Sequence, residues 1–137
     1  MDYFHLSMKE HTPEEFVNLA KGSSKIAISD ELKKRIQLCR DFLDNKMKNQ
    51  KEPIYGITTG FGSLCNVTIN PDELSQLQKN LVMSHACGVG EEVPVEIVRL
   101  MLILKVKSLS YGYSRVRLET VERLIDIINN MVTPSAY

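Results

Sequence analysis

The hydrophobic positions of this chain recur at intervals of three and four residues in five segments, which is the spacing of one face of an α-helix. The predicted helices cover residues 12–22, 29–49, 70–87, 94–110 and 114–130. At the start of the first segment, Thr12 is the expected N-cap, Pro13 takes the first helical position, and Glu15 completes a capping box. The pattern therefore predicts a mostly helical protein.

The fourth predicted helix, residues 94–110, differs from the others because its apolar residues cover nearly its whole circumference. These residues are Val95, Ile97, Val98, Leu100, Met101, Leu102, Ile103, Leu104 and Val106. A helix that is apolar all round is typical of a buried core helix. We therefore expect this helix to be buried on all sides, either in the core of the chain or at an interface.

Residues 54–70 interrupt the helical pattern. Gly56, Gly60 and Gly62 are three of the seven glycines of the chain, and they predict a loop with unusual backbone angles or close backbone contacts. A short extended piece is predicted over residues 66–69. The fold class we expect is all-α, as a single domain over residues 1–137, with one glycine-rich loop and at most short strands.

Composition narrows the classes of function. The 137 residues carry 17 Lys and Arg against 17 Asp and Glu, so the net charge is zero and a nucleic-acid partner is not expected. The most apolar run, residues 100–104, is too short to cross a membrane. The first residues do not resemble a signal peptide. An odd number of cysteines, three, favours reduced thiols and a cytoplasmic location.

General catalytic motifs do not indicate a function for this sequence. The chain has no GxxxxGK[ST], HExxH or GxSxG segment, and its histidines and cysteines lack metal-ligand spacing, so no metal is expected. Two residues remain as candidates for chemistry. Tyr55 begins the glycine-rich loop and could exchange protons if its pKa were lowered from about 10. His85 ends the third predicted helix next to a glycine turn and could bind a polar ring or carry a proton.

Both candidates have ordinary structural alternatives. Tyr55 could be a half-buried tyrosine whose hydroxyl has one hydrogen-bond partner. His85 could interact with the dipole at the C-terminus of its helix. The residues alone leave these alternatives open.

Three segments together resemble one family. Residues 55–62, YGITTGFG, resemble the YGxNTGFG signature of the aromatic amino acid ammonia-lyases. Residues 77–90, LQKNLVMSHACGVG, resemble that family's LQxNLxxSHxxGxG segment, and residues 112–117, GYSRVR, are similar to its GYSGVR segment. The Ser84-His85 pair is most similar to histidine ammonia-lyase, since phenylalanine lyases typically carry Phe-Leu there and tyrosine lyases His-Leu.

The resemblance implies the N-terminal helical portion of an ammonia-lyase-like fold, and elimination of ammonia from L-histidine to give urocanate. It implies that Tyr55 takes part in proton transfer and that His85 contacts the side chain of the substrate. Ser84 and Gly60 are the further expected substrate-binding residues. Family members are helical-bundle homotetramers whose active sites combine several subunits, so a homo-oligomer is expected.

The family's electrophile, methylidene-imidazolone (MIO), forms from an Ala-Ser-Gly tripeptide, which these 137 residues do not contain. We therefore expect a truncated part of a lyase-like protein that is inactive alone. Thr58 stands where the family usually has Asn, and Arg115 where it usually has Gly, which places a long cation in a tight position. The alternatives are a non-catalytic helical assembly or binding module, and a fragment of a tyrosine or phenylalanine lyase or of an aminomutase.

Overall fold

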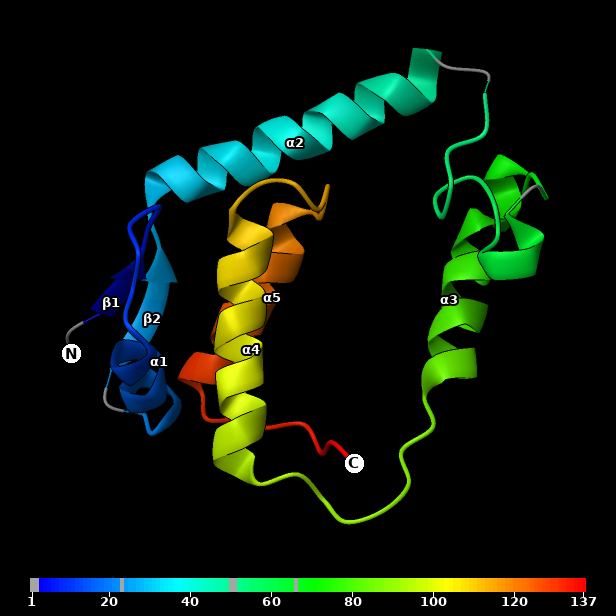
Figure 1. Ribbon diagram of the computed structural model, residues 1–137. Coiled ribbons are helices and arrows are strands. Elements are labelled where there is room, and N and C mark those ends of the chain that lie inside the picture. Colours follow the sequence, from blue (N-terminus) through cyan, green and yellow to red (C-terminus); the bar gives the residue numbers. More distant parts are fainter. Residues whose placement is uncertain (1–2, 23, 50–51, 66) are drawn as a thin grey trace. The chain divides into compact units, whose positions relative to one another are not determined.

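The computed structural model describes residues 3–22, 24–49, 52–65 and 67–137 (Figure 1). Its elements, in chain order, are β1 (Tyr3–Leu6), α1 (Pro13–Ala20), β2 (Lys25–Ile28), α2 (Asp30–Asn49), 3-10 turns at Gly62–Leu64 and Pro71–Glu73, α3 (Leu74–His85), α4 (Val95–Ser110) and α5 (Leu118–Asn129). The described part is mostly helical with two short strands, which confirms the predicted fold class. The chain divides into a larger unit, residues 1–48 and 90–137, and a smaller unit, residues 49–89.

The helix starts predicted from capping residues are largely present. Thr12 Oγ1 accepts the Glu15 N–H at 3.3 Å, and a Glu15 carboxylate oxygen accepts the Thr12 N–H at 2.7 Å, which completes the capping box of α1. At the start of α2, Ser29 Oγ accepts the Leu32 N–H at 3.4 Å. The first and second helices therefore begin where the sequence predicts.

Three helix boundaries differ from the prediction. α3 begins at Leu74 rather than residue 70, because Pro71–Glu73 forms a 3-10 turn, and it ends at His85. α5 begins at Leu118 rather than residue 114, its N-cap is Arg117, and no side chain caps it. α4 follows the prediction, with Pro94 as its N-cap.

A parallel two-stranded ribbon was not specified by the sequence. β1 pairs with β2 in the register Tyr3 with Lys25 through Leu6 with Ile28, and α1 forms the crossover between them. The Asn129 side chain from α5 then hydrogen-bonds Ile26 of β2 twice, accepting its N–H at 2.8 Å and donating to its carbonyl at 2.9 Å. The ribbon is thus tied to α5 through a single amide.

The core of the larger unit is made by residues from both strands and from α1, α2, α4 and α5. Its buried members are Leu6, Leu19, Ala20, Ile26, Ile28, Leu32, Ile36, Ile103, Val106, Val121, Ile125 and Ile128. α4 packs against α1 and against α5 (Figure 1). These contacts place α4 in the middle of the unit.

Within this chain α4 is not surrounded on all sides, so the chain alone does not bury it. It exposes several large apolar side chains: Val95, Ile97, Met101 and Leu104. It buries two cations instead, Arg99 and Lys107. The helix is therefore turned so that these two cations face inward.

The reason is that both cations bind main-chain carbonyl groups. Arg99 is 3% exposed; its Nε donates to Ala20 O at 2.7 Å and its Nη1 to Ile128 O at 3.3 Å. These carbonyls lie at the C-terminal ends of α1 and α5, where the helix dipole also favours a cation. Arg99 therefore joins three helices at one point.

Lys107, further along α4, also donates to main-chain carbonyl groups. Its Nζ donates to Ser7 O and to Lys9 O, the latter at 3.1 Å, and lies 5.1 Å from the centre of the Tyr111 ring. The segment between β1 and α1 is thereby held against α4.

The turn between α4 and α5 contains the departure at Arg115. Gly112, with φ +78°, lies so close to α2 that a Cβ there would be 2.9 Å from Arg35 O. Arg115 itself has φ +55°, a left-handed conformation that glycine adopts freely and other residues rarely do. Its side chain is exposed rather than confined, so the strain lies in the backbone.

Arg99→Met is expected to lower the free energy of unfolding by about 2–4 kcal/mol, because two buried carbonyl groups lose a charged donor. Chemical denaturation followed by circular dichroism measures the change. Lys105→Met, an exposed cation on the same helix, is the matched control and is expected to stay within about 0.5 kcal/mol of the parent. Equal stability of the two variants would contradict the role assigned to Arg99.

Arg115→Gly is expected to raise the free energy of unfolding by about 1 kcal/mol, because glycine removes the cost of the left-handed backbone. Arg115→Ala is the matched control, since it removes the same side chain and keeps the Cβ. Thermal denaturation of both variants separates the two effects. A gain of the same size in Arg115→Ala would assign the effect to the side chain and would contradict the backbone explanation.

Candidate functional site

Both segments that carry the candidate residues lie in the smaller unit. The Tyr55 loop begins with a turn in which Thr58 closes on Ile54. Ile54 O accepts the N–H groups of Ile57 at 3.0 Å and Thr58 at 2.9 Å, and Thr58 Oγ1 accepts the Ile54 N–H at 2.8 Å. Thr58 therefore makes a local side-chain contact at the position where an asparagine was expected.

Thr59 fixes the centre of the loop. It is almost fully buried; its Oγ1 accepts the Gly56 N–H at 3.2 Å and donates to Gly60 O at 3.0 Å. Thr59 also forms an antiparallel bridge with Thr68, so part of the extended piece predicted over residues 66–69 is present; Asn66 lies outside the described residues. These bonds close the loop onto the residues that follow it.

Gly60 belongs to the same hydrogen-bond network of the loop. Its N–H donates to Val67 O at 3.4 Å, its carbonyl accepts the Thr59 hydroxyl, and the residue is buried. Both of its main-chain groups are thus engaged within the loop. The expectation that Gly60 binds substrate stays a prediction, and its visible role is to let the loop close.

Tyr55 projects from this closed loop. Its side chain is 62% exposed, and its ring meets the edge of the Phe61 ring at a centroid distance of 5.7 Å and an angle of 67°. Gly56, with φ +69°, leaves room for Phe61, since a Cβ there would lie 3.0 Å from Phe61 Cε1. The Tyr55 hydroxyl hydrogen-bonds none of the described residues, so it is open to a ligand.

His85 is the last residue of α3 and is exposed. Its Nδ1 lies 2.9 Å from Leu81 O and 3.0 Å from Ser84 Oγ, and Ser84 Oγ donates to Leu81 O at 2.8 Å. Its Nε2 hydrogen-bonds none of the described residues. The ring is therefore anchored through one nitrogen and presents the other.

The structure does not bring Tyr55 and His85 into contact. Among the described residues, no hydrogen bond or ring contact joins the loop to His85. α3 itself separates its first and last residues by about 16 Å. The two candidates share a compact unit, and each has an open polar group, but they do not form a pair within it.

Sequence reasoning named Thr58 only as a departure from the family pattern, and it missed two further residues that hold the site in shape: Thr59 and Phe61. The pair of threonines inside a glycine-rich loop is the signal that could have predicted the structural role of both, because threonine hydroxyl groups bond to nearby backbone. Phe61 had no such signal, since its contact with Tyr55 depends on the fold of the loop.

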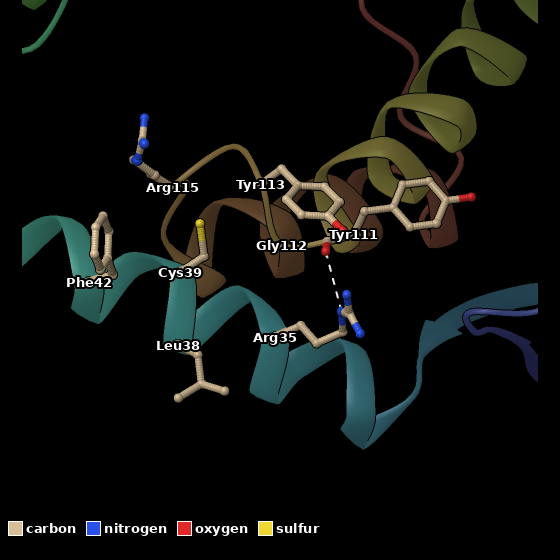
Figure 2. A pocket seen from close by; sticks show the side chains of 8 residues that line it. All are labelled: Arg35, Leu38, Cys39, Phe42, Tyr111, Gly112, Tyr113 and Arg115. Carbon is tan, nitrogen blue, oxygen red and sulfur yellow. Dashed lines mark hydrogen bonds between the residues drawn. The ribbon is translucent and has the colours of Figure 1, made fainter.

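The larger unit contains an open cavity of about 460 Å³ between α2 and residues 111–115 (Figure 2). It is lined by two arginines, Arg35 and Arg115, and by apolar and aromatic side chains, with the Cys39 thiol directed toward the turn. Arg35 Nε donates to Tyr111 O at 3.4 Å, as the dashed line in Figure 2 marks. None of the candidate site residues lines this cavity.

Cofactor and membrane features add little to the site. Within the described ranges, no group of three His, Cys, Asp or Glu side chains could hold a metal ion, and no helix is long and apolar enough to span a bilayer. MIO does not fit the residues present, because no Ala-Ser-Gly tripeptide occurs among the 137 residues to form it. The chemistry that these residues can offer is that of a tyrosine hydroxyl and an imidazole.

Known proteins match both the sequence and the fold. Residues 11–137 match the family model described as aromatic amino acid lyase. A histidine ammonia-lyase from Caldanaerobacter subterraneus subsp. tengcongensis is 44% identical over 123 residues, which are 90% of this chain and 24% of that protein.

Solved structures also match the fold of this chain. Histidine ammonia-lyase from Trypanosoma cruzi superposes with a TM-score of 0.81 at 36% identity, covering 93% of this chain and 24% of that one. The ergothioneine-degrading enzyme ergothionase from Treponema denticola gives a TM-score of 0.91 at 26% identity, covering 98% and 27%.

This chain spans about a quarter of the length of the curated relatives it matches. The family match, in contrast, extends over nearly all of this chain. The resemblance seen in the three sequence segments is thus confirmed, and the chain belongs to the aromatic amino acid lyase family.

Proposed function

We propose that this chain supplies the tyrosine loop and the ring-binding helix end of a histidine ammonia-lyase active site. The reaction is the elimination of ammonia from L-histidine to give urocanate, in which the C–N bond breaks and the adjacent carbon loses a proton. The observation that carries the proposal is the exposed His85 at the end of α3, with Nδ1 anchored and Nε2 open. The identity of 38–44% to several histidine ammonia-lyases supports the choice of substrate.

Tyr55 is the proposed acid or base for the proton that the substrate loses or the amine gains. Its hydroxyl hydrogen-bonds none of the described residues, and its ring packs against the edge of the Phe61 ring. A positioned side chain of this kind typically contributes 10²–10⁴-fold to a rate. Gly60 and Ser84 are proposed to shape the same site, Gly60 by closing the loop and Ser84 beside His85.

The electrophile is proposed to come from polypeptide outside these 137 residues, because none of them can form MIO. The complete enzyme is proposed to be a cytoplasmic homo-oligomer. The exposed apolar side chains of α4 support association, since burying such groups is favourable. The same side chains would equally serve a non-catalytic assembly module, which is the second candidate.

One prediction of this proposal concerns the 137-residue chain alone. Purified chain of verified length is expected to form no urocanate from L-histidine, because it lacks the tripeptide that forms the electrophile. Ultraviolet absorbance or chromatography of the reaction mixture measures the product. Urocanate formation above that of a Tyr55→Phe control preparation would contradict this prediction.

A second prediction tests the catalytic assignment in a complete enzyme. In a hybrid enzyme, residues 11–137 of this chain replace the matching segment of the Streptococcus gordonii histidine ammonia-lyase, to which this chain is 41% identical over 126 residues. The hybrid enzyme is expected to make urocanate. His85→Leu in the hybrid is expected to lower kcat/KM for histidine by about 10–100-fold, because the substrate ring loses a polar partner.

Lys79→Leu, an exposed polar-to-apolar change on the same helix, is the matched control and is expected to keep full activity. A correctly assembled hybrid without activity would favour the non-catalytic module. An unchanged preference for histidine in His85→Leu would remove the reason for choosing histidine over tyrosine or phenylalanine as the substrate.

A further inference from the structure

We infer that Ser84 is a positioning residue that fixes the tautomer of His85. The hydrogen-bond network at the end of α3 holds the proton of the neutral ring on Nδ1, so that Nε2 faces the site as an acceptor. The tautomer itself follows from contacts within this chain. Its consequence for substrate selection rests on the proposed function.

The assignment of the proton starts from the Leu81 carbonyl. A carbonyl oxygen can only accept hydrogen bonds, and Nδ1 of His85 lies 2.9 Å from it. Nδ1 must therefore carry the hydrogen for this contact to be attractive. In the other neutral tautomer, two lone pairs would face each other at this distance.

Ser84 makes this arrangement self-consistent. Its hydroxyl donates to the same carbonyl at 2.8 Å, which turns its lone pairs toward Nδ1 of His85 at 3.0 Å. The Nδ1–H group then has two acceptors, Leu81 O and Ser84 Oγ. In the other tautomer the Ser84 hydroxyl would have to leave Leu81 O to donate to Nδ1, and Nδ1 would still face Leu81 O as a second acceptor. With its hydroxyl on Leu81 O, the serine therefore favours the tautomer protonated on Nδ1.

The consequence is a defined recognition chemistry. A neutral ring protonated on Nδ1 offers a lone pair at Nε2. That lone pair pairs with a ring that carries its own donor, such as the N–H of an imidazole. A plain phenyl ring has no such donor and would leave Nε2 without a partner.

A purely structural role for Ser84 makes a different prediction. Serine near a helix end often bonds to the carbonyl three residues earlier and merely satisfies it. In that case removal of the hydroxyl would change the stability of α3 but would leave the proton distribution on His85 unchanged. The tautomer is therefore the readout that separates the two roles.

The experiment is nitrogen-15 NMR of the 137-residue chain with labelled histidine, in alkaline buffer where imidazole side chains are neutral. His85→Gln identifies the His85 signals among the three histidines. The parent chain is expected to show a protonated Nδ1 and an unprotonated Nε2 as the major form. Ser84→Ala is expected to lower the share of that form by at least about half, since one of two acceptors and its orienting bond are lost.

Ser84→Thr keeps the hydroxyl and is expected to restore the parent pattern. Ser75→Ala, an exposed serine on the same helix, is the matched control and is expected to leave it unchanged. In the hybrid enzyme, Ser84→Ala is expected to raise KM for histidine about three- to tenfold with little change in kcat, and Ser84→Thr to reverse this.

The inference is overturned if His85 of the parent chain is mainly protonated on Nε2, or if Ser84→Ala gives the parent spectrum. These outcomes are independent of catalysis. A hybrid enzyme that makes urocanate while Ser84→Ala leaves the tautomer unchanged refutes the inference alone. A fixed tautomer in a chain whose hybrid is inactive refutes the proposed function alone.

Discussion

The larger unit depends on one buried cation. Arg99 donates from the middle of the unit to carbonyl groups that end α1 and α5, so a single guanidinium links three helices. This requirement sets the rotation of α4, because its arginine must point inward. The outward direction of Met101 and Leu104 on the same helix follows from that rotation, and the apolar surface of α4 is thus a consequence of a polar contact.

Much of the fold could be predicted from local signals, and the failures have one cause. The capping box at Thr12 and the course of α2 and α4 depend on neighbours in the sequence. The burial of Arg99 and Lys107 depends on carbonyl groups 79 and 100 residues away, which no periodicity can reveal. The strands β1 and β2 were missed for a similar reason: four residues are too few for an alternating pattern, and each strand exists only through the other.

The candidate site also combines residues that could be predicted from the sequence with residues whose role could not. Tyr55 and His85 were found because motifs record residue types at fixed spacing. The structural roles of Thr58 and Thr59 were not predicted, although their hydroxyl groups shape the loop through bonds to its own backbone. The residue that stands in place of the family's usual asparagine is therefore not an idle substitution, because it supplies a different contact at the same turn.

The amide of Asn129 has an effect that reaches beyond its two hydrogen bonds with Ile26. A two-stranded ribbon leaves main-chain donors and acceptors along its outer sides, and such edges can recruit a strand from another molecule. The Asn129 amide hydrogen-bonds both the N–H and the carbonyl of Ile26, as a residue of a neighbouring strand would do. The last turn of α5 thus covers part of one edge of the ribbon without adding a strand.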